Sequence, residues 1–411
     1  MREALGIFMI LFLVGYHYKN VEPGILKKFY FPALMLKLGA GIAVGLVYTY
    51  YYQGGDTWNY FDQAKILGKV AFSTTDNFYE LYFKSNYSLL EGFAYPFQPR
   101  AALMVKIVAL INVFTNHNYW LTSLFFSFAS FWGLFKFASW VNTSFKFGTA
   151  AGVALFIWPS FVFWSSGILK ESLAVGLIFG LIASFMQMLN KKKYHNIIAL
   201  LLGFYLLFAI KYYYAAVLLV ILLLYGISLI FSFSKKTVVW QIFAFAILLI
   251  TGFVLAGFLH PNLKFDTILG VIIGNNEAFL AKSTQASAIH FYAANSDWLW
   301  LLINVPQALI ASLVMPLWFY SFKPMYIIVV LENWLLLGLF IRGVYVTNWK
   351  EVGANFSLLF VSVSYVSMLA VFLALSTPNF GTLARYKVAF IPIVLVLIVL
   401  MNKPVKRKQV V

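Results

Sequence analysis

Two adjoining stretches decide the fold: YFPALMLKLGAGIAVGLVYTYYY at residues 30–52, and QGGDTWNYFD at residues 53–62. The first is apolar over the ~20 residues that a helix needs to cross a bilayer. The second places Asp56 and Asp62 at the mouth of that helix, in a chain with only 13 acidic residues. Acids in water-facing loops usually serve solubility. We interpret an acid that follows two glycines, among aromatic residues at a membrane boundary, as a candidate site.

Composition gives the class of protein. Of 411 residues 62% are hydrophobic and 10% are charged, and apolar runs recur from end to end. No soluble fold buries that much apolar sequence. The runs are long and continuous, not alternating, which favours helices over a membrane barrel. We therefore expect one all-α, polytopic membrane domain over residues 1–411, crossing the lipid bilayer of the cell inner (plasma) membrane several times.

The net charge of +17 does not indicate a nucleic-acid partner. Lys and Arg cluster in short loops, where they set membrane orientation and meet anionic headgroups. Cysteine is absent, which excludes disulfides, thiolate metal sites and a Cys nucleophile. The apolar N-terminal stretch lacks a small-residue cleavage site, so we interpret it as a retained helix or interfacial anchor.

The apolar runs predict about 11–13 transmembrane helices. Two polar segments, 53–100 and 260–297, are long enough to fold outside the membrane, as a large first outer loop and a second outer loop. The candidate spans are 4–18, 30–52, 101–115, 118–140, 149–165, 172–190, 196–211, 213–232, 238–259, 298–320, 325–342, 355–375 and 387–402.

Basic residues predict the orientation, because cytoplasmic loops carry excess Lys and Arg. With these basic residues on the cytoplasmic side, both long loops lie on the outer side. The basic residues are Lys27, Lys28, Lys191–Lys193, Lys235, Lys236, Lys403, Lys406, Arg407 and Lys408. Counting every span as a crossing would put Lys191–Lys193 outside, so one segment before it must not cross. We expect this to be 101–115, which is short and carries Lys106. Pro306, Pro316 and Pro324 predict a broken helix further on.

The Gly54–Tyr60 stretch carries the first candidate site. Glycines let the chain turn sharply after a helix, and Asp56 then lies near the headgroup plane. A carboxylate there can accept a proton from a hydroxyl nucleophile. The alternative is that Asp56 or Thr57 caps a helix running to about Val70. For Asp62 we favour such an ordinary structural role, although it is kept as a candidate substrate-binding residue.

A second candidate lies between two apolar segments. Lys170 and Glu171 follow Pro159 and Gly167, which both weaken helix. Charges at membrane depth normally face a cavity or a partner. Lys170 could neutralise a phosphate; the alternative is a plain loop with an adjacent ion pair.

Two further basic positions stand between or before apolar runs. Lys211 precedes three tyrosines, which an aromatic belt explains, and snorkelling explains the lysine in part. Arg385, next to Tyr386, precedes the last span and could bind phosphate oxygens in a bidentate fork, or could be a basic anchor.

Three other features complete the search. Glu332 lies inside an apolar run and needs a partner or a cavity. The five histidines show no metal spacing, and no metal site is predicted from them. There is no Walker loop, dinucleotide glycine pattern or nucleophile elbow.

The layout resembles the polytopic GT-C glycosyltransferases, which have many helices and a large first outer loop. In that family an acidic residue near the start of this loop is the catalytic base, and Asp56 stands in its place. A basic residue near a lipid phosphate also belongs to the family picture, with Lys170, Lys211 and Arg385 as candidates. The Gly-Gly-Asp, Ser-Gly-x-x-Lys-Glu and Ala-Arg-Tyr series also looks like membrane proteins of bacterial surface-polysaccharide pathways. No large soluble domain follows the last span, which leaves the acceptor open.

The resemblance implies an enzyme that transfers a hexosyl or pentosyl group from a polyprenyl-phosphate donor, with inversion, at the outer face. The acceptor would be a glycan, a lipid or a protein. The cofactor is unknown; a divalent metal near Asp56 is compatible with the sequence but not required by it. The alternatives are a polysaccharide polymerase, a non-enzymatic flippase or transporter of lipid-linked glycans, and a membrane scaffold.

Overall fold

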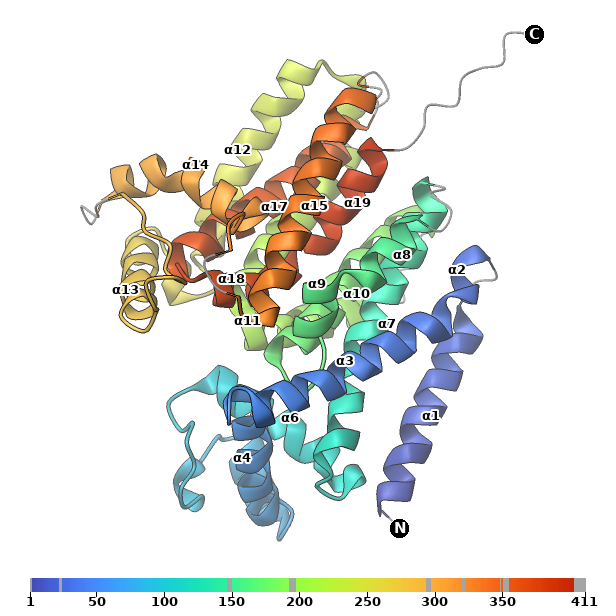
Figure 1. The fold of residues 1–411 in the computed structure, drawn as a ribbon, viewed down its shortest axis with the longest axis vertical. Helices are drawn as coiled ribbons and strands as arrows, with labels where there is room; N and C mark the ends of the chain where they lie inside the picture. The colour runs from blue at the N-terminus through green and yellow to red at the C-terminus, as the bar shows by residue number, and fades with distance from the viewer. Residues whose placement is uncertain are drawn as a thin grey trace. The chain divides into compact units, whose positions relative to one another are not determined.

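The structure of the chain is a computed structural model that describes residues 2–21, 24–145, 150–191, 197–292, 297–319, 322–347, 349 and 355–402 (Figure 1). In these ranges the regular elements are helices, and the only strand-like pairing is an isolated bridge between Ala288 and Asn379. The all-α class predicted from the sequence is therefore confirmed. The basic residues Lys192, Lys193, Lys403, Lys406, Arg407 and Lys408 lie outside the described ranges.

Most of the long helices coincide with the apolar runs, and further helices lie in the polar segments 53–100 and 260–297. Their bounds are α1 Arg2–Asn20, α2 Ile25–Lys28, α3 Tyr30–Tyr50, α4 Asp56–Ala71, α5 Thr75–Tyr82, η1 Tyr87–Leu89, α6 Pro99–Thr115, α7 Tyr119–Phe145, α8 Ala150–Ile157, α9 Pro159–Trp164, α10 Lys170–Lys191, α11 Ile197–Ile230, η3 Phe233–Lys235, α12 Val238–Ala256, η4 Pro261–Leu263, α13 Ile268–Leu280, α14 Trp298–Val314, α15 Pro324–Val346, α17 Phe356–Ser376, α18 Phe380–Tyr386, η5 Lys387–Ala389 and α19 Ile391–Met401.

Among the described residues, seven helices are long and apolar enough to cross a membrane: α3, α7, α10, α11, α12, α15 and α17. The helices 380–389 and 391–401 form a pair that is bent by 71°. If this pair counts as one span, the described residues contain up to eight candidate spans. This number is smaller than the 11–13 predicted from apolar runs. Polytopic helical architecture is nevertheless what the structure contains.

Physical reasons explain the smaller number. The runs 196–211 and 213–232 are two helical stretches that meet without a loop at Lys211, whose backbone is non-helical (φ −146°, ψ 80°), and together they make up α11. α1 is too polar at its two ends, and α6, with 17 residues, is too short. The run 149–165 divides at Trp158 into two short helices, because Pro159 cannot continue the first one. The run 298–320 ends as a helix at Val314, so the break predicted from the prolines is present.

The chain divides into two compact units. The first comprises residues 1–144, 162–186 and 194–211, and the second comprises 145–161, 187–193 and 212–411. In the second unit α17 packs against α13 and α14, and α19 packs against α8 and α15.

In the first unit, the segment 53–100 is mostly helical and not an irregular loop. Its α4 lies along α6, and the two helices share a buried core (Figure 1). Phe61 and Leu67 of α4 contribute to this core, together with Val105 of α6 and Phe93 of the connecting segment. Burial of such side chains stabilises by roughly 1.5–3 kcal/mol each, so α4 has a fixed position on α6.

Candidate functional site

Asp56 is the first residue of α4, immediately after a sharp turn. Gln53, Gly54 and Gly55 have φ values of 54°, 131° and 112°, a left-handed region that favours glycine. The Gly54 amide donates to the Tyr48 carbonyl at 2.9 Å. A Cβ at Gly55 would lie 3.0 Å from the Tyr48 ring. The glycines therefore allow α4 to begin directly beside the end of α3.

The residue that caps α4 is Gly55, and its cap makes no side-chain hydrogen bond. The predicted alternative, in which Asp56 or Thr57 caps the helix, is therefore wrong about the capping residue. The predicted end of the helix, Val70, is one residue from the observed end at Ala71. Thr57 is fully buried, and its hydroxyl hydrogen-bonds the Tyr119 hydroxyl at 2.6 Å. A carboxylate in the first turn still interacts favourably with the helix dipole.

Two neighbours of Asp56 fix the rotation of α4. Trp58 stacks on Tyr119 at 3.9 Å between ring centroids, and its Nε1 donates to Thr49 Oγ1 at 2.9 Å. Thr57 contacts the same Tyr119. With this side of the helix anchored, residues 56, 59, 60 and 63 share another face, since they follow helical spacing.

Tyr95 lies beside that face. Its loop is held by the Ala94 amide, which donates to Gln63 Oε1 at 2.8 Å, and by buried Phe93. The Tyr95 ring lies 5.7 Å from that of Tyr60. Burial raises the pKa of Tyr95, and the Asp56 charge raises this pKa further, while a hydrogen bond with the Asn59 side chain opposes the rise. The phenol therefore lies within reach of Asp56.

Lys170 reaches the same face from the start of α10. The preceding turn has Gly167 at φ 73°, and the Gly167 amide donates to Ser127 Oγ at 3.0 Å. Lys170 Nζ lies 5.2 Å from the centre of the Tyr60 ring. The charge of Asp56 acts on this ammonium, as do those of Arg100, Glu171 and Lys211. Asp56 and Lys170, far apart in sequence, thus belong to one charged cluster.

Glu171 and Lys211 form a buried ion pair beneath this cluster. Lys211 Nζ lies 2.8 Å from Glu171 Oε1, and the side chains are 5% and 1% exposed. Two buried charges are tolerated because they compensate each other. Lys211 stands at the kink of α11, so snorkelling does not describe it. The sequence suggested an ion pair between Glu171 and its chain neighbour Lys170. The structure shows an ion pair between Glu171 and Lys211.

Asp62 lies about one and two-thirds turns beyond Asp56 on α4. Its side chain is 59% exposed and pairs with Lys65 at 3.1 Å. The pair is a surface contact between residues three positions apart.

Arg385 and Tyr386 belong to α18, in the second unit, and both side chains are half-buried. The Tyr214 hydroxyl donates to the Tyr386 carbonyl at 3.2 Å. Lys170 belongs to the first unit, and the roles of Lys170 and Arg385 at a lipid phosphate stay predictions. Glu332, which was expected to need a partner, accepts the Ser160 amide at 2.7 Å and lies within reach of the Lys387 charge.

Sequence reasoning did not select Asn59, Tyr95 or Arg100 as site residues. Asn59 and Tyr60 could have been found from helical spacing, because they follow Asp56 at three and four positions. Tyr95 and Arg100 carried no such signal, since the packing of the Tyr95 loop and of α6 on α4 decides their positions.

The cluster combines a carboxylate, a phenol and an ammonium around Tyr60. A carboxylate can accept a proton, and an ammonium can neutralise a developing anion. Among the described residues no group of three or more His, Asp or Glu side chains could hold a metal ion. Comparison of the chain with protein-family models, curated proteins and solved structures finds no match.

Proposed function

We propose that the protein is a membrane glycosyltransferase that moves a sugar from a polyprenyl-phosphate donor to an acceptor hydroxyl at the outer face of the membrane. The observation that carries the proposal is the cluster of Asp56 and Lys170 around Tyr60. A glycosyl transfer in which a phosphate is the leaving group uses a base for the acceptor and a cation for the phosphate. The long apolar helices of the first unit, among them α3, α7 and α10, suit a donor whose tail lies in the bilayer.

The reaction assigns each residue one role. Asp56 takes the proton of the acceptor hydroxyl as the oxygen forms a bond to the anomeric carbon. The bond from that carbon to the phosphate oxygen breaks, and the electron pair leaves with the polyprenyl phosphate. Lys170 stabilises the charge on the departing phosphate. Attack from the face opposite the phosphate inverts the anomeric configuration.

Glu171 and Lys211 act as positioning residues. Their ion pair holds the first turn of α10 against α11, and this turn carries Lys170. The pair is too deeply buried to meet a substrate directly, with exposures of 1% and 5%. We propose that both residues support the Lys170 side chain.

The test is a transfer assay with purified protein in nanodiscs and a panel of polyprenyl-phosphate sugars. We expect one donor to release polyprenyl phosphate in the presence of an acceptor, with an inverted linkage by NMR. The same sugars on nucleotide diphosphates are the control donors and should be inert. Failure of every lipid-linked donor to release lipid phosphate would overturn the proposal, and movement of an intact donor across the bilayer would favour a flippase.

A further inference from the structure

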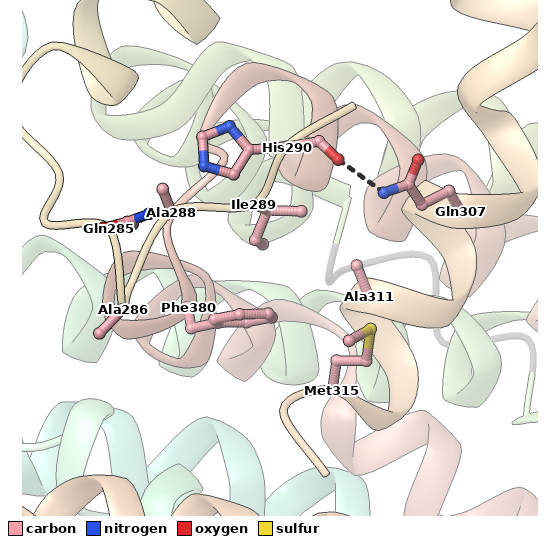
Figure 2. Close-up of a pocket in the computed structure, with 9 residues that line it drawn as sticks. All are labelled: Gln285, Ala286, Ala288, Ile289, His290, Gln307, Ala311, Met315 and Phe380. Carbon is pink, nitrogen blue, oxygen red and sulfur yellow. Dashed lines mark hydrogen bonds between the residues drawn. The ribbon is translucent and has the colours of Figure 1, made fainter. Parts of the chain in front are cut away.

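The second unit contains a cavity of about 240 Å³, formed by the segment 285–290, α14 and the start of α18 (Figure 2). Phe380, Ile289 and Met315 surround its apolar part in Figure 2. The polar groups are Gln285, His290 and Gln307. Mostly apolar walls with a few placed polar groups are typical of small-molecule sites.

Backbone hydrogen bonds hold the walls in place. The Ile289 amide donates to the Pro378 carbonyl, and the Phe380 amide donates to the Ser287 carbonyl, both at 2.9 Å. Gln307 Nε2 donates to the His290 carbonyl at 2.7 Å, the bond drawn in Figure 2. The segment is thus tied to both α14 and α18, and the cavity is preformed.

Asn379 adds a second set of ties beside the cavity. Its Nδ2 donates to Ser283 Oγ at 2.8 Å and to Ser287 Oγ at 3.1 Å. Its Oδ1 accepts the Thr382 amide and so caps α18. One side chain therefore fixes both the segment 283–287 and the helix that carries Phe380.

The lining chemistry selects the class of ligand. Of the described residues that line the cavity, none is Asp, Glu, Lys or Arg. A charged ligand would lose its hydration without gaining a counterion. Side-chain amides both donate and accept hydrogen bonds, which matches hydroxyl groups. An aromatic ring and aliphatic side chains match the apolar C–H face of a sugar ring.

We propose that this cavity binds one uncharged pyranose residue of a glycan. The sugar places its C–H face toward Phe380 and its hydroxyl groups toward the amides of Gln285 and Gln307. A purely aliphatic ligand would make no hydrogen bond with the Gln285 amide or with the carbonyl oxygen of the Gln307 side chain, which is less favourable. The proposal goes beyond the transferase function and does not rest on it, since binding is measured without any donor.

The test is saturation-transfer-difference NMR of the full chain in nanodiscs, with methyl glycosides of glucose, galactose, mannose and N-acetylglucosamine as probes. Nanodiscs avoid maltoside detergents, which would compete. We expect ring-proton signals from one probe or more. Ala286→Trp fills the cavity from an exposed position and should abolish them. Gln285→Ala should weaken binding about two- to tenfold, the value of one or two hydrogen bonds.

Lys282→Ala is the matched control, because Lys282 is exposed and lies just before the lining segment. It should retain the signals. Hexanol serves as the apolar probe. Saturation of hexanol without any methyl glycoside would overturn the proposal, as would sugar signals that persist unchanged in Ala286→Trp. Retained folding of each variant is checked by thermal unfolding followed through tryptophan fluorescence.

Discussion

The two aspartates of α4 stand on the same helix in opposite environments. Asp56 is half-buried and shares its surroundings with Tyr95 and Lys170. Asp62 is 59% exposed, and its salt bridge in the described part of the first unit is with its helix neighbour Lys65. The two aspartates are six residues apart, so they lie on different faces of α4. What differs is the tertiary contact that each face of α4 makes, and this decides which carboxylate can take part in chemistry.

The ion pairs of the first unit show the same contrast. Asp62 and Lys65 are 59% and 45% exposed, whereas Glu171 and Lys211 are 1% and 5% exposed. An exposed pair contributes about 0–1 kcal/mol, because water screens both charges. Removing one partner of a buried pair costs about 3–5 kcal/mol, because the other charge is left without compensation. One pair is therefore dispensable and the other is part of the fold.

Asp56→Asn should have the largest effect on catalysis. The amide keeps the size of the side chain and removes the base, so kcat in the transfer assay should fall about 10²–10⁴-fold. Asp62→Asn is the matched control on the same helix and should leave kcat within about twofold, because surface substitutions have small effects. Equal losses in the two variants would abolish the distinction between the aspartates.

Lys211→Met should have the largest effect on stability. It removes the Lys211 ammonium that pairs with the buried Glu171 carboxylate, so the free energy of unfolding should drop by about 3–5 kcal/mol. Lys65→Met is the control and should change it by less than about 1 kcal/mol. The measurement is thermal unfolding of the purified protein in nanodiscs.

The double variant Glu171→Gln with Lys211→Met sharpens this result. It removes both charges, so it should be more stable than Lys211→Met alone. A double variant that is less stable than the single one would show that the two residues act through packing and not through their charges.

The sequence could predict the helices but not their partners. Apolar periodicity and length identify α3, α7 and α12 within a few residues, because burial in lipid requires long apolar helices. The local sequence also predicts the turn at Gly54–Gly55 and indicates Asp56 as a candidate site residue. The buried pair of Glu171 and Lys211 is not, since 40 positions separate them and only the packing of α10 on α11 joins them.

The sequence predicts more spans than the described residues contain as long apolar helices, for a related reason. Hydropathy marks where a chain is apolar but does not measure where a helix bends or ends. The runs 196–211 and 213–232, for example, meet without a loop at Lys211, whose backbone is non-helical. The opposite error concerns the segment that contains α4. Its polar composition predicts a loop, but α4 is a helix that shares a buried core with α6.

Lys170→Met tests the cationic part of the cluster. Loss of the ammonium that stabilises the leaving phosphate should lower kcat about 10²–10³-fold, as for other groups that stabilise developing charge. Lys65→Met is again matched, because Lys65 also lies over an aromatic ring, 4.5 Å from the centre of Phe61. Lys170→Arg should restore part of the activity. A loss confined to protein yield, with normal kcat, would contradict the role.

Tyr95→Phe should have the smallest effect of the three substitutions that are expected to lower kcat. It removes the hydroxyl that hydrogen-bonds Asn59 near Asp56 and keeps the ring that contacts Tyr60. One neutral hydrogen bond is worth about 0.5–1.5 kcal/mol, so kcat should fall about two- to tenfold. Burial and the Asp56 charge raise the pKa of Tyr95, so the phenol keeps its proton across the neutral pH range. Wild type and Tyr95→Phe should therefore show the same pH profile across that range. A profile whose alkaline limb disappears in Tyr95→Phe would instead mean that this phenol ionises during turnover, and Asp56 would then have to share the role of base.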